Sequence, residues 1–364
     1  MFAKNTKKNT DGQITNVICN SAKQGLIPQR EYFDKDIANS DNTSGYYIIE
    51  ENDFVYNPRK SSDAPYGPIS SYKYPDAGIV SPLYLCFRAK GAINPSFYEW
   101  YFRSSAWHRY VYMSGDSGAR HDRVSIKDDV FFAMPISIPS AREQEHIASF
   151  LDMIDQRIDK QRALVDNLKK YKRGVTNAIF NRKLIFSSED SPYPQWEEKY
   201  IGDICKIQTG KSNTQDETSQ GIYPFYVRSP IVRKSNRYLL DCEAVLTVGD
   251  GVGTGKVFHY VQGRFDLHQR VYAMTDFKMV SGKYFYYYFA HFFYDRVMRM
   301  TAKTSVDSVR YEMIDRMTIL VPCKEEQQKI VCFLDRIEKK IKNAEEELNL
   351  LEKNKSGFLQ QLFI

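Results

Sequence analysis

Catalytic and metal-binding motifs are missing from this 364-residue sequence. The six cysteines form neither a CxxC pair nor another spacing typical of zinc ligands, and no HExxH or GxSxG motif is present. The AdoMet motif and the NPPY-type tetrapeptide of DNA methyltransferases are absent as well. The six histidines are scattered and have no evident carboxylate partner in the sequence. We therefore expect a binding protein with no catalytic residues, no metal and no cofactor.

Long apolar segments are also missing. No run approaches the ~20 residues that a membrane span requires, and the first ten residues lack the features of a signal peptide. A hydrophobic content of 42% is sufficient for the cores of two or three soluble domains. We therefore expect a cytoplasmic protein with free thiols and no membrane partner.

Positive charge is present but not concentrated. The net charge is +6, and the segments 1–139, 140–183, 184–321 and 322–364 carry +1, +4, +1 and 0. None of these segments is a polybasic tail. If the protein binds nucleic acid, it must do so through local patches, so charge alone is weak support for such binding.

Residues 249–256, GDGVGTGK, do not complete a nucleotide-binding motif. A Walker A loop ending at Gly255-Lys256 requires glycine where Asp250 stands and Ser or Thr where Val257 stands. Neither GxGxxG frame is completed, and the following residues are strand-like rather than helical. We predict a loop between strands, whose glycines let backbone NH groups approach a partner closely.

One stretch of the sequence occurs twice. Residues 138–180 superimpose on residues 321–363 with an offset of 183 and no gap. The two copies share a proline, a Glu-Gln pair and a Phe-Leu-Asp triplet, at Pro139 and Pro322, 143–144 and 326–327, and 150–152 and 333–335. An internal repeat of this kind indicates a duplicated structural unit.

Apolar residues in both copies alternate at spacings of four and three, which is the pattern of a coiled-coil seam. The predicted seam residues are Ile147, Leu151, Ile154, Ile158, Val165 and Leu168 in the first copy, and Ile330, Leu334, Ile337, Ile341, Leu348 and Leu351 in the second. At about 1.5 Å per residue, a helix of ~38 residues is roughly 57 Å long. Two unrelated amphipathic helices are the alternative, but the identical phase favours two helices that pack on each other.

The repeat predicts an α+β fold with a pseudo-twofold arrangement. We expect two similar globular domains at 1–139 and 184–321, joined by long helices at 140–183 and 322–364 that form an antiparallel coiled coil. Residues 95–112 of the first domain are predicted to form one helix with an aromatic face. The aromatic run 284–294 of the second is predicted to be a buried helix rather than a base-stacking platform.

Two basic regions are candidates for nucleic-acid contact. Between Glu217 and Asp241 every charged residue is a cation, and tyrosines lie among them, which suits phosphate binding, although a solvated basic loop is equally compatible. The loop at 59–66 in the first domain has a similar basic, glycine-bounded character to 249–256 in the second. The candidate residues are Arg59, Lys60, Ser61, Tyr66, Arg120, His121, Lys211, Arg228, Arg233, Lys234, Asp250, Lys256, His268, Gln269, Arg270 and Lys303.

The sequence resembles the specificity subunits of type I restriction–modification systems. The most specific features are the two P-x3-EQ-x2-I-x2-FLD-x-I helices and the W-x3-YIGDI…GK segment at 196–211. The resemblance implies two target-recognition domains, each reading half of a split double-stranded DNA sequence and held apart by an antiparallel helix pair. It also implies two DNA-methyltransferase (modification) subunits as partners and, in the full complex, restriction/translocase subunits. The chain itself would be non-catalytic.

One departure from the family pattern is visible: the first domain lacks the W…IGDI…GK opening of the second, so either its start is shortened or the missing strand is supplied differently. Two other functional classes compete with DNA binding. One is a coiled-coil scaffold that binds only proteins, and the other is an enzyme that holds a nucleotide on the glycine loop. Salt-dependent, sequence-selective DNA binding would favour the first class.

A deletion in the repeated helices tests whether their length sets the spacing of the two half-sites. Removing one heptad from both, at 161–167 and 344–350, preserves the seam and removes about 10.5 Å at 1.5 Å per residue. We expect the preferred spacer, selected from a library, to shorten by roughly 3 base pairs at ~3.4 Å each. Deleting from one helix alone should be worse because the seams then mismatch. An unchanged spacer after the double deletion would contradict the helix-length hypothesis.

Overall fold

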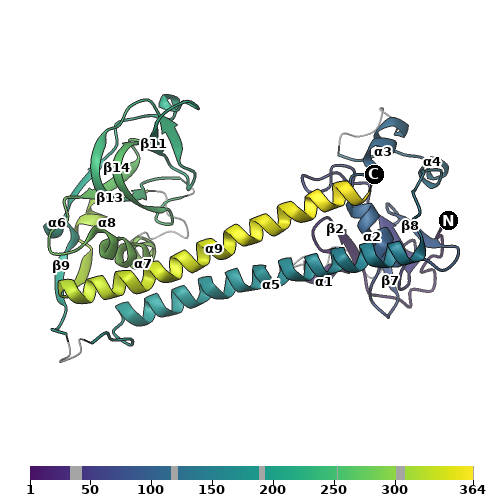
Figure 1. Cartoon of the computed structure of the whole chain (residues 1–364), viewed down its shortest axis with the longest axis horizontal. Coiled ribbons are helices and arrows are strands. Elements are labelled where there is room, and N and C mark those ends of the chain that lie inside the picture. The colour runs from purple at the N-terminus through teal and green to yellow at the C-terminus, as the bar shows by residue number, and fades with distance from the viewer. Residues whose placement is uncertain (33–42, 116–121, 188–192, 252, 301–307, 364) are drawn as a thin grey trace. The chain divides into compact units, whose positions relative to one another are not determined.

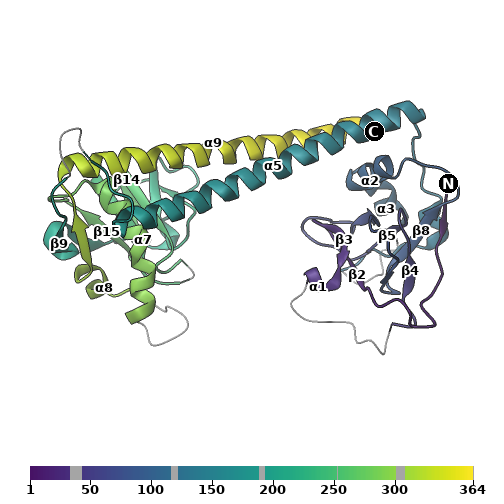
Figure 2. The same cartoon turned by 90° about the horizontal axis from the view of Figure 1, so that it is seen from below.

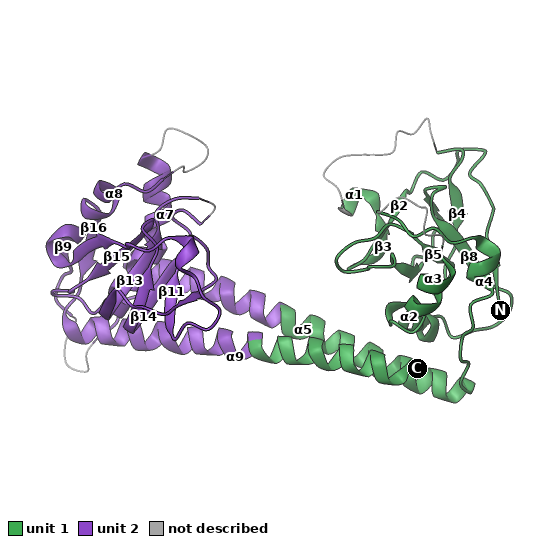
Figure 3. Cartoon of the chain, turned by 90° about the horizontal axis from the view of Figure 1, so that it is seen from above, with its two compact units in different colours: residues 1–162, 346–364 green, residues 163–345 purple. Residues whose placement is uncertain are grey.

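The computed structural model describes all residues except 33–42, 116–121, 188–192, 252, 301–307 and 364. The chain divides into two compact units, unit 1 with residues 1–162 and 346–364 and unit 2 with residues 163–345 (Figure 3). This division falls inside two long helices, α5 (Ala141–Phe180) and α9 (Lys324–Leu362), which contain 40 and 39 residues (Figure 1). Each unit therefore combines a globular part with a stretch of both helices.

The two helices run antiparallel within each unit. In unit 1, ring centroids of Phe150 and Phe358 lie 5.1 Å apart, and Arg157 pairs with Glu347 further along. In unit 2, Lys169 pairs with Glu345 at 2.7 Å and Lys172 with Glu338 at 2.5 Å. The repeat offset converts Lys172–Glu338 into Lys355–Asp155, which is also an ion pair. The internal symmetry of the sequence is therefore also present in the contacts.

The residues expected at the seam are all buried or half-buried. Leu151 and Leu334, which are equivalent in the two copies, are fully buried. Leu151 belongs to the core of unit 1 together with Phe363, while Leu334 belongs to the core of unit 2 together with Phe180. The seam residues therefore pack not only helix against helix but also the helices against each globular part.

The repeated glutamine and aspartate have the same structural role in both units. Gln144 and Gln327 each donate a side-chain hydrogen bond of 2.9 Å to the carbonyl of the repeated proline five residues earlier. Asp152 accepts hydrogen bonds from Ser96 and Trp100, and Asp335 accepts from Tyr287 and contacts Lys283. These partners lie on helices of the globular parts. The repeated carboxylate therefore attaches each globular part to its long helix.

Unit 1 contains a four-stranded antiparallel sheet of order β1-β8-β5-β6, formed by Phe2–Lys4, Leu85–Ala89, Phe54–Tyr56 and Ile69–Ser71. Two-stranded sheets pair β2 (Ile18–Ser21) with β3 (Gly25–Pro28) and β4 (Tyr47–Ile49) with β7 (Gly78–Val80). The short helices are α1 (Gln29–Tyr32), α2 (Pro95–Arg103), α3 (His108–Ser114) and α4 (Asp128–Phe132). Figure 2 shows these strands grouped beside α2 and α3.

The single helix expected at 95–112 is wrong, because the structure breaks it into α2 and α3. Ser104 ends α2 with an extended backbone, and its hydroxyl donates to the carbonyl of Tyr101 at 2.7 Å. The aromatic pattern continued across this break, so periodicity alone did not reveal it. Trp107, at the start of α3, is buried and donates its indole NH to Phe102.

Unit 2 contains a six-stranded sheet of order β10-β15-β13-β14-β11-β12. Its strands are Lys206–Thr209, Val271–Thr275, Leu240–Val248, Phe258–Leu267, Tyr223–Tyr226 and Arg233–Ser235. β9 (Glu197–Tyr200) pairs with β16 (Thr318–Val321), and the helical segments are α6 (Ile201–Ile204), η2 (Thr214–Asp216), α7 (Gly282–Met300) and α8 (Tyr311–Asp315). The expectation of a buried aromatic helix at 284–294 is confirmed, since α7 buries Tyr284, Phe289 and Phe293.

The order β1-β8-β5-β6 in unit 1 matches β10-β15-β13-β14 in unit 2, with antiparallel pairing throughout. β1 of unit 1 pairs with β8 as β10 pairs with β15. Residues 135–138, which stand where β16 stands in unit 2, form no strand. The missing W…IGDI segment is therefore the part that forms β9 and α6 in unit 2, and the sheet itself is complete without it.

Candidate nucleic-acid interface

Three loops of unit 2 meet at one site. The glycine loop 249–256 follows β13, residues 268–270 connect β14 to β15, and Arg228 follows β11. The Gly249 amide donates to the carbonyl of Arg270 at 2.7 Å, and the His268 amide donates to Tyr226 at 3.0 Å. A Cβ at position 249 would lie 2.8 Å from that Arg270 carbonyl, so glycine is required for this close approach.

The glycine loop uses part of its hydrogen-bonding capacity internally. Gly251 and Gly255 have positive φ angles of 83° and 66°, which glycine adopts without strain. The amides of Thr254 and Lys256 donate to the carbonyls of Gly251 and Gly253. The expectation that the backbone donors of this loop face a ligand is therefore wrong at these two positions.

Asp250 lies between two arginines from different segments. Its carboxylate oxygens are 3.5 Å from Nη1 of Arg228 and 3.6 Å from Nε of Arg270. The two arginine side chains are 50% and 64% exposed, whereas that of Asp250 is 24% exposed. One carboxylate thus lies in ion-pair range of two largely exposed arginine side chains, and the group carries one net positive charge. Oδ1 of Asp250 is buried and has no hydrogen-bond partner in the described structure. We name Arg228, Asp250 and Arg270 the arginine triad.

His268 is buried, which corrects the expectation that it forms part of the contact surface. Only 4% of the residue is exposed, and its Nδ1 accepts a hydrogen bond of 3.1 Å from the Arg270 amide. Burial lowers the pKa of His268 below its usual value, and the charges of Arg228 and Arg270 lower it further against the opposing effect of Asp250. A neutral imidazole is therefore favoured at neutral pH, where it supports the backbone of Arg270.

A buried carboxylate that the sequence did not reveal organises the neighbouring loops. Asp266 is 1% exposed and accepts hydrogen bonds from the hydroxyls of Ser212 and Ser235 and from the Leu267 amide. Arg237 lies 3.5 Å from Asp266 and 2.9 Å from Asp216. Arg237 belongs to the acid-free basic stretch, which is a signal that could have identified it. Asp266 is an isolated acid in a strand, and no pattern distinguishes it.

The other candidate residues of unit 2 differ in their side-chain partners. Lys211 and Lys234 are exposed, and no carboxylate in the described part of the chain lies within 4 Å of either amine. Arg233 pairs with Glu217 at 2.9 Å, and Lys256 lies over the ring of Tyr294 at 5.1 Å. Gln269 is exposed and donates to the side-chain oxygen of Asn213. Lys303 lies outside the described residues.

The loop after β5 in unit 1 occupies the place of the glycine loop in unit 2. The Val124 amide donates to the carbonyl of Pro58 at 2.8 Å, as the Val309 amide donates to Gly249 at 2.7 Å. Both contacts connect this loop to the segment preceding the next short helix. The loops at 59–66 and 249–256, which the sequence suggested were equivalent, therefore occupy equivalent places in their units.

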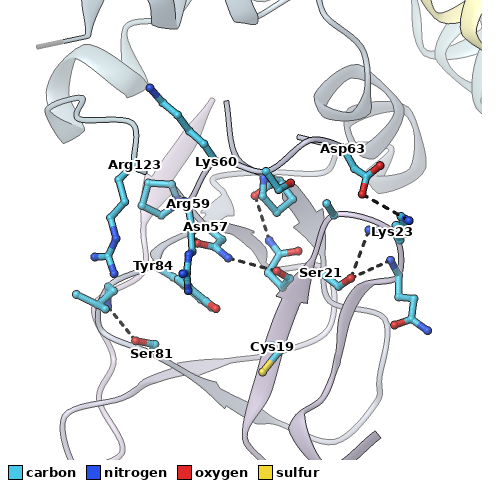
Figure 4. A pocket seen from close by; sticks show the side chains of 17 residues that line it. Cys19, Ser21, Lys23, Asn57, Arg59, Lys60, Asp63, Ser81, Tyr84 and Arg123 are labelled. Atoms are coloured by element: carbon cyan, nitrogen blue, oxygen red, sulfur yellow. Dashed lines mark hydrogen bonds and ion pairs between the residues drawn. The ribbon is translucent and has the colours of Figure 1, made fainter. Parts of the chain in front are cut away.

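This loop borders a cavity of about 860 Å³ with basic walls. Arg59, Lys60 and Ser61 line it together with Arg123, which the sequence reasoning missed. Figure 4 shows Arg59 extending beside Tyr84, while the side chain of Lys60 extends away from them. The Nε atom of Arg123 is buried and has no hydrogen-bond partner in the described structure. The carboxylate of Asp122 lies 4.0 Å from this atom. A polyanion at the cavity would contact the exposed side chains of Arg59 and Lys60.

Three further residues of unit 1 were expected to contact DNA, namely Tyr66, Arg120 and His121. Tyr66 is half-buried, with its ring 4.6 Å from that of His108 and 6.5 Å from that of Trp107. Its side chain therefore packs partly on the core and does not line the cavity, and its assignment as a contact residue stays a prediction. Arg120 and His121 lie outside the described residues.

In the described part of the chain, none of the helices combines the length and apolar character needed to cross a membrane. Nor do the described histidine, cysteine and acidic side chains form a group of three or more that could hold a metal ion.

A family model described as the type I restriction modification DNA specificity domain matches residues 193–353. The chain is 22% identical over 165 residues to the EcoDI specificity subunit of Escherichia coli, a match covering 45% of this chain and 36% of that protein. It is 22% identical over 271 residues to the MjaIX specificity subunit of Methanocaldococcus jannaschii, covering 65% and 61%. The matches thus span from about a third to three fifths of these relatives.

Two solved structures share the fold. The type I restriction–modification S subunit from M. genitalium superimposes with a TM-score of 0.62 at 13% identity, covering 100% of this chain and 93% of that one. The HsdS subunit from Thermoanaerobacter tengcongensis gives a TM-score of 0.51 at 15% identity, covering 99% and 93%. At these identities the comparison establishes the fold, and the function must be argued from the sites.

Proposed function

We propose that this chain is a specificity subunit similar to those of type I restriction–modification systems and that it binds double-stranded DNA at a bipartite target sequence. The observation that carries the proposal is the duplication of one basic site. Equivalent loops follow the equivalent strands β5 and β13, and each loop lies beside cationic side chains that are exposed or that lack a hydrogen-bond partner.

Both sites contain cationic side chains that can contact DNA phosphates. Lysines and arginines without a carboxylate partner are free to contact phosphates, which dominate affinity and are independent of sequence. Arg59 and Lys60 in unit 1 and Lys234 in unit 2 are of this kind, because no carboxylate of the described chain lies within 4 Å of them. Two such sites in one chain would each contact one half of a split target.

We further propose that the long helices bind protein partners, namely two modification subunits and, in the full complex, restriction/translocase subunits. Large apolar side chains on these helices remain exposed, including Met153 at 62%, Tyr171 at 53% and Leu350 at 57%. A partner that covers these side chains would remove their apolar surface from water, which stabilises the complex. In this proposal the partners perform the catalysis, and the chain supplies recognition.

The exposed helix surface also supports the scaffold alternative, in which the chain binds proteins only. A titration with DNA separates the two. The full chain, co-purified with its modification partner, is titrated with random-sequence duplex and with duplexes selected from a library, at two salt concentrations. We expect affinity to fall as salt rises, and selected duplexes to bind more tightly than random ones at both. A complex that forms with the partner but shows no DNA binding would favour the scaffold.

A further inference from the structure

The arginine triad differs from every other cationic group in the described part of unit 2. Arg228 and Arg270 come from different loops and approach one carboxylate, that of Asp250, at 3.5 and 3.6 Å. Both arginine side chains remain at least half exposed. The backbone beside Asp250 is anchored, because Gly249 donates to the Arg270 carbonyl and accepts from the Val309 amide. Oδ1 of Asp250 is buried without a hydrogen-bond partner in the described structure, so the two arginines are drawn to the carboxylate by ion pairs alone, which restrict the region that each side chain occupies.

Restricted orientation is of little use for contacting a phosphate. Phosphate contacts depend mainly on charge, and a carboxylate in the middle of the site would repel the phosphate and halve the available positive charge. Reading a base requires the opposite. An arginine fork must place two NH groups against O6 and N7 of one guanine in the major groove, and this geometry discriminates against other bases. Holding the fork beforehand reduces the conformational entropy lost on binding.

We infer that Arg228 and Arg270 each read a guanine in the DNA half-site bound by unit 2, and that Asp250 is a positioning residue that orients both. This inference rests on the proposed DNA-binding function and adds the bases recognised. It predicts two G·C pairs in that half-site. Unit 1 has no equivalent arrangement in its described residues, since Arg59 has no carboxylate within 4 Å.

The test uses the full chain with its modification partner and a library of random-sequence duplexes. Selection is performed with the wild-type chain and with Arg270→Lys, Arg228→Lys and Asp250→Asn. Lysine keeps the charge but cannot form the two-pronged contact. We expect each lysine variant to lose roughly 5- to 150-fold preference for guanine at one position, from the discrimination of about 1–3 kcal/mol for a bidentate pair. Asp250→Asn should weaken both preferences together.

Lys234→Ala is the matched control, because Lys234 is an exposed cation of the same unit without a carboxylate partner. It should weaken binding to all sequences alike while leaving the guanine preferences intact. It should also reduce by about one the slope of the logarithm of the binding constant against the logarithm of the salt concentration. A second readout replaces the selected guanines by 7-deazaguanine, which lacks N7. The wild type should lose affinity on this substitution, and the corresponding lysine variant should not lose more.

The possible failures are distinguishable. If the wild-type complex selects no sequence, the proposed function fails and the inference fails with it. If the wild type selects a bipartite sequence but both lysine variants keep every preference, only the inference is overturned. Selection of A·T pairs at the positions that respond to Arg228 or Arg270 would also overturn the guanine assignment. Thermal unfolding of each variant shows whether a change in preference comes from altered recognition or from lost folding.

Discussion

Replacing Asp266 by alanine is expected to destabilise unit 2 by about 3–5 kcal/mol, because it removes a buried, charged hydrogen-bond acceptor from its donors. The change leaves the hydroxyls of Ser212 and Ser235 and the Leu267 amide without the carboxylate they now share. Exposed Arg237 contributes less to this loss, since solvent screens its charge. Urea unfolding followed by the fluorescence of Trp196, the tryptophan of unit 2, measures the effect.

Asp266→Asn provides the control for size and shape. Asparagine keeps an oxygen that can accept from one of the serines, so we expect a smaller loss than for alanine. The alanine variant should also weaken DNA binding under conditions where it is still folded, because Ser212 and Arg237 lie on loops of the proposed contact surface. Equal stability of the alanine variant and the wild type would show that Asp266 does not organise these loops.

Truncating the equivalent leucines Leu151 and Leu334 to alanine should each cost about 2–5 kcal/mol, the range for a fully buried leucine in a well-packed core. The two effects should appear in different units. Leu151 packs in the core that contains Trp100 and Trp107, and Leu334 in the core that contains Trp196. Unfolding of a Trp196→Phe variant reports on unit 1 alone, so only Leu151→Ala should shift its transition strongly.

Leu350→Ala is the matched control on the same helix as Leu334. Its side chain is 57% exposed and does not belong to either core, so a change of no more than about 0.5 kcal/mol is expected. If Leu350→Ala and Leu334→Ala destabilise the chain equally, the seam described above is not the main source of helix packing energy.

The helical part of this fold was predictable because its signals are local. A heptad pattern specifies which side of a helix is buried, and a repeat without gaps specifies that the same arrangement occurs twice. The function of the repeated aspartates was not predictable. Asp152 and Asp335 bind residues of α2 and α7, and such contacts across the sequence leave no spacing that can be recognised. The break between α2 and α3 was missed for the related reason that a single serine cap interrupts an otherwise continuous pattern.

The candidate site shows the same division between local and distant information. Basic composition and glycines identified the loops that contain Arg228, Asp250 and Arg270. Composition does not indicate the direction of a side chain, so buried His268 was wrongly assigned to the surface. Arg123 was missed because only the folded chain places it beside Arg59.

Unit 1 is built from two stretches of the chain that are separated by the whole of unit 2, and this affects its synthesis on the ribosome. Phe97 and Tyr101 of α2 pack against Phe363, with ring centroids 5.5 and 5.9 Å apart. The aromatic face is translated before unit 2, and Phe363 is translated after it. All of unit 2, in contrast, is translated before residue 346. The unit that begins first is therefore completed last, and its aromatic face must remain protected in the nascent chain, by transient packing or by a chaperone, until the final turns of α9 emerge.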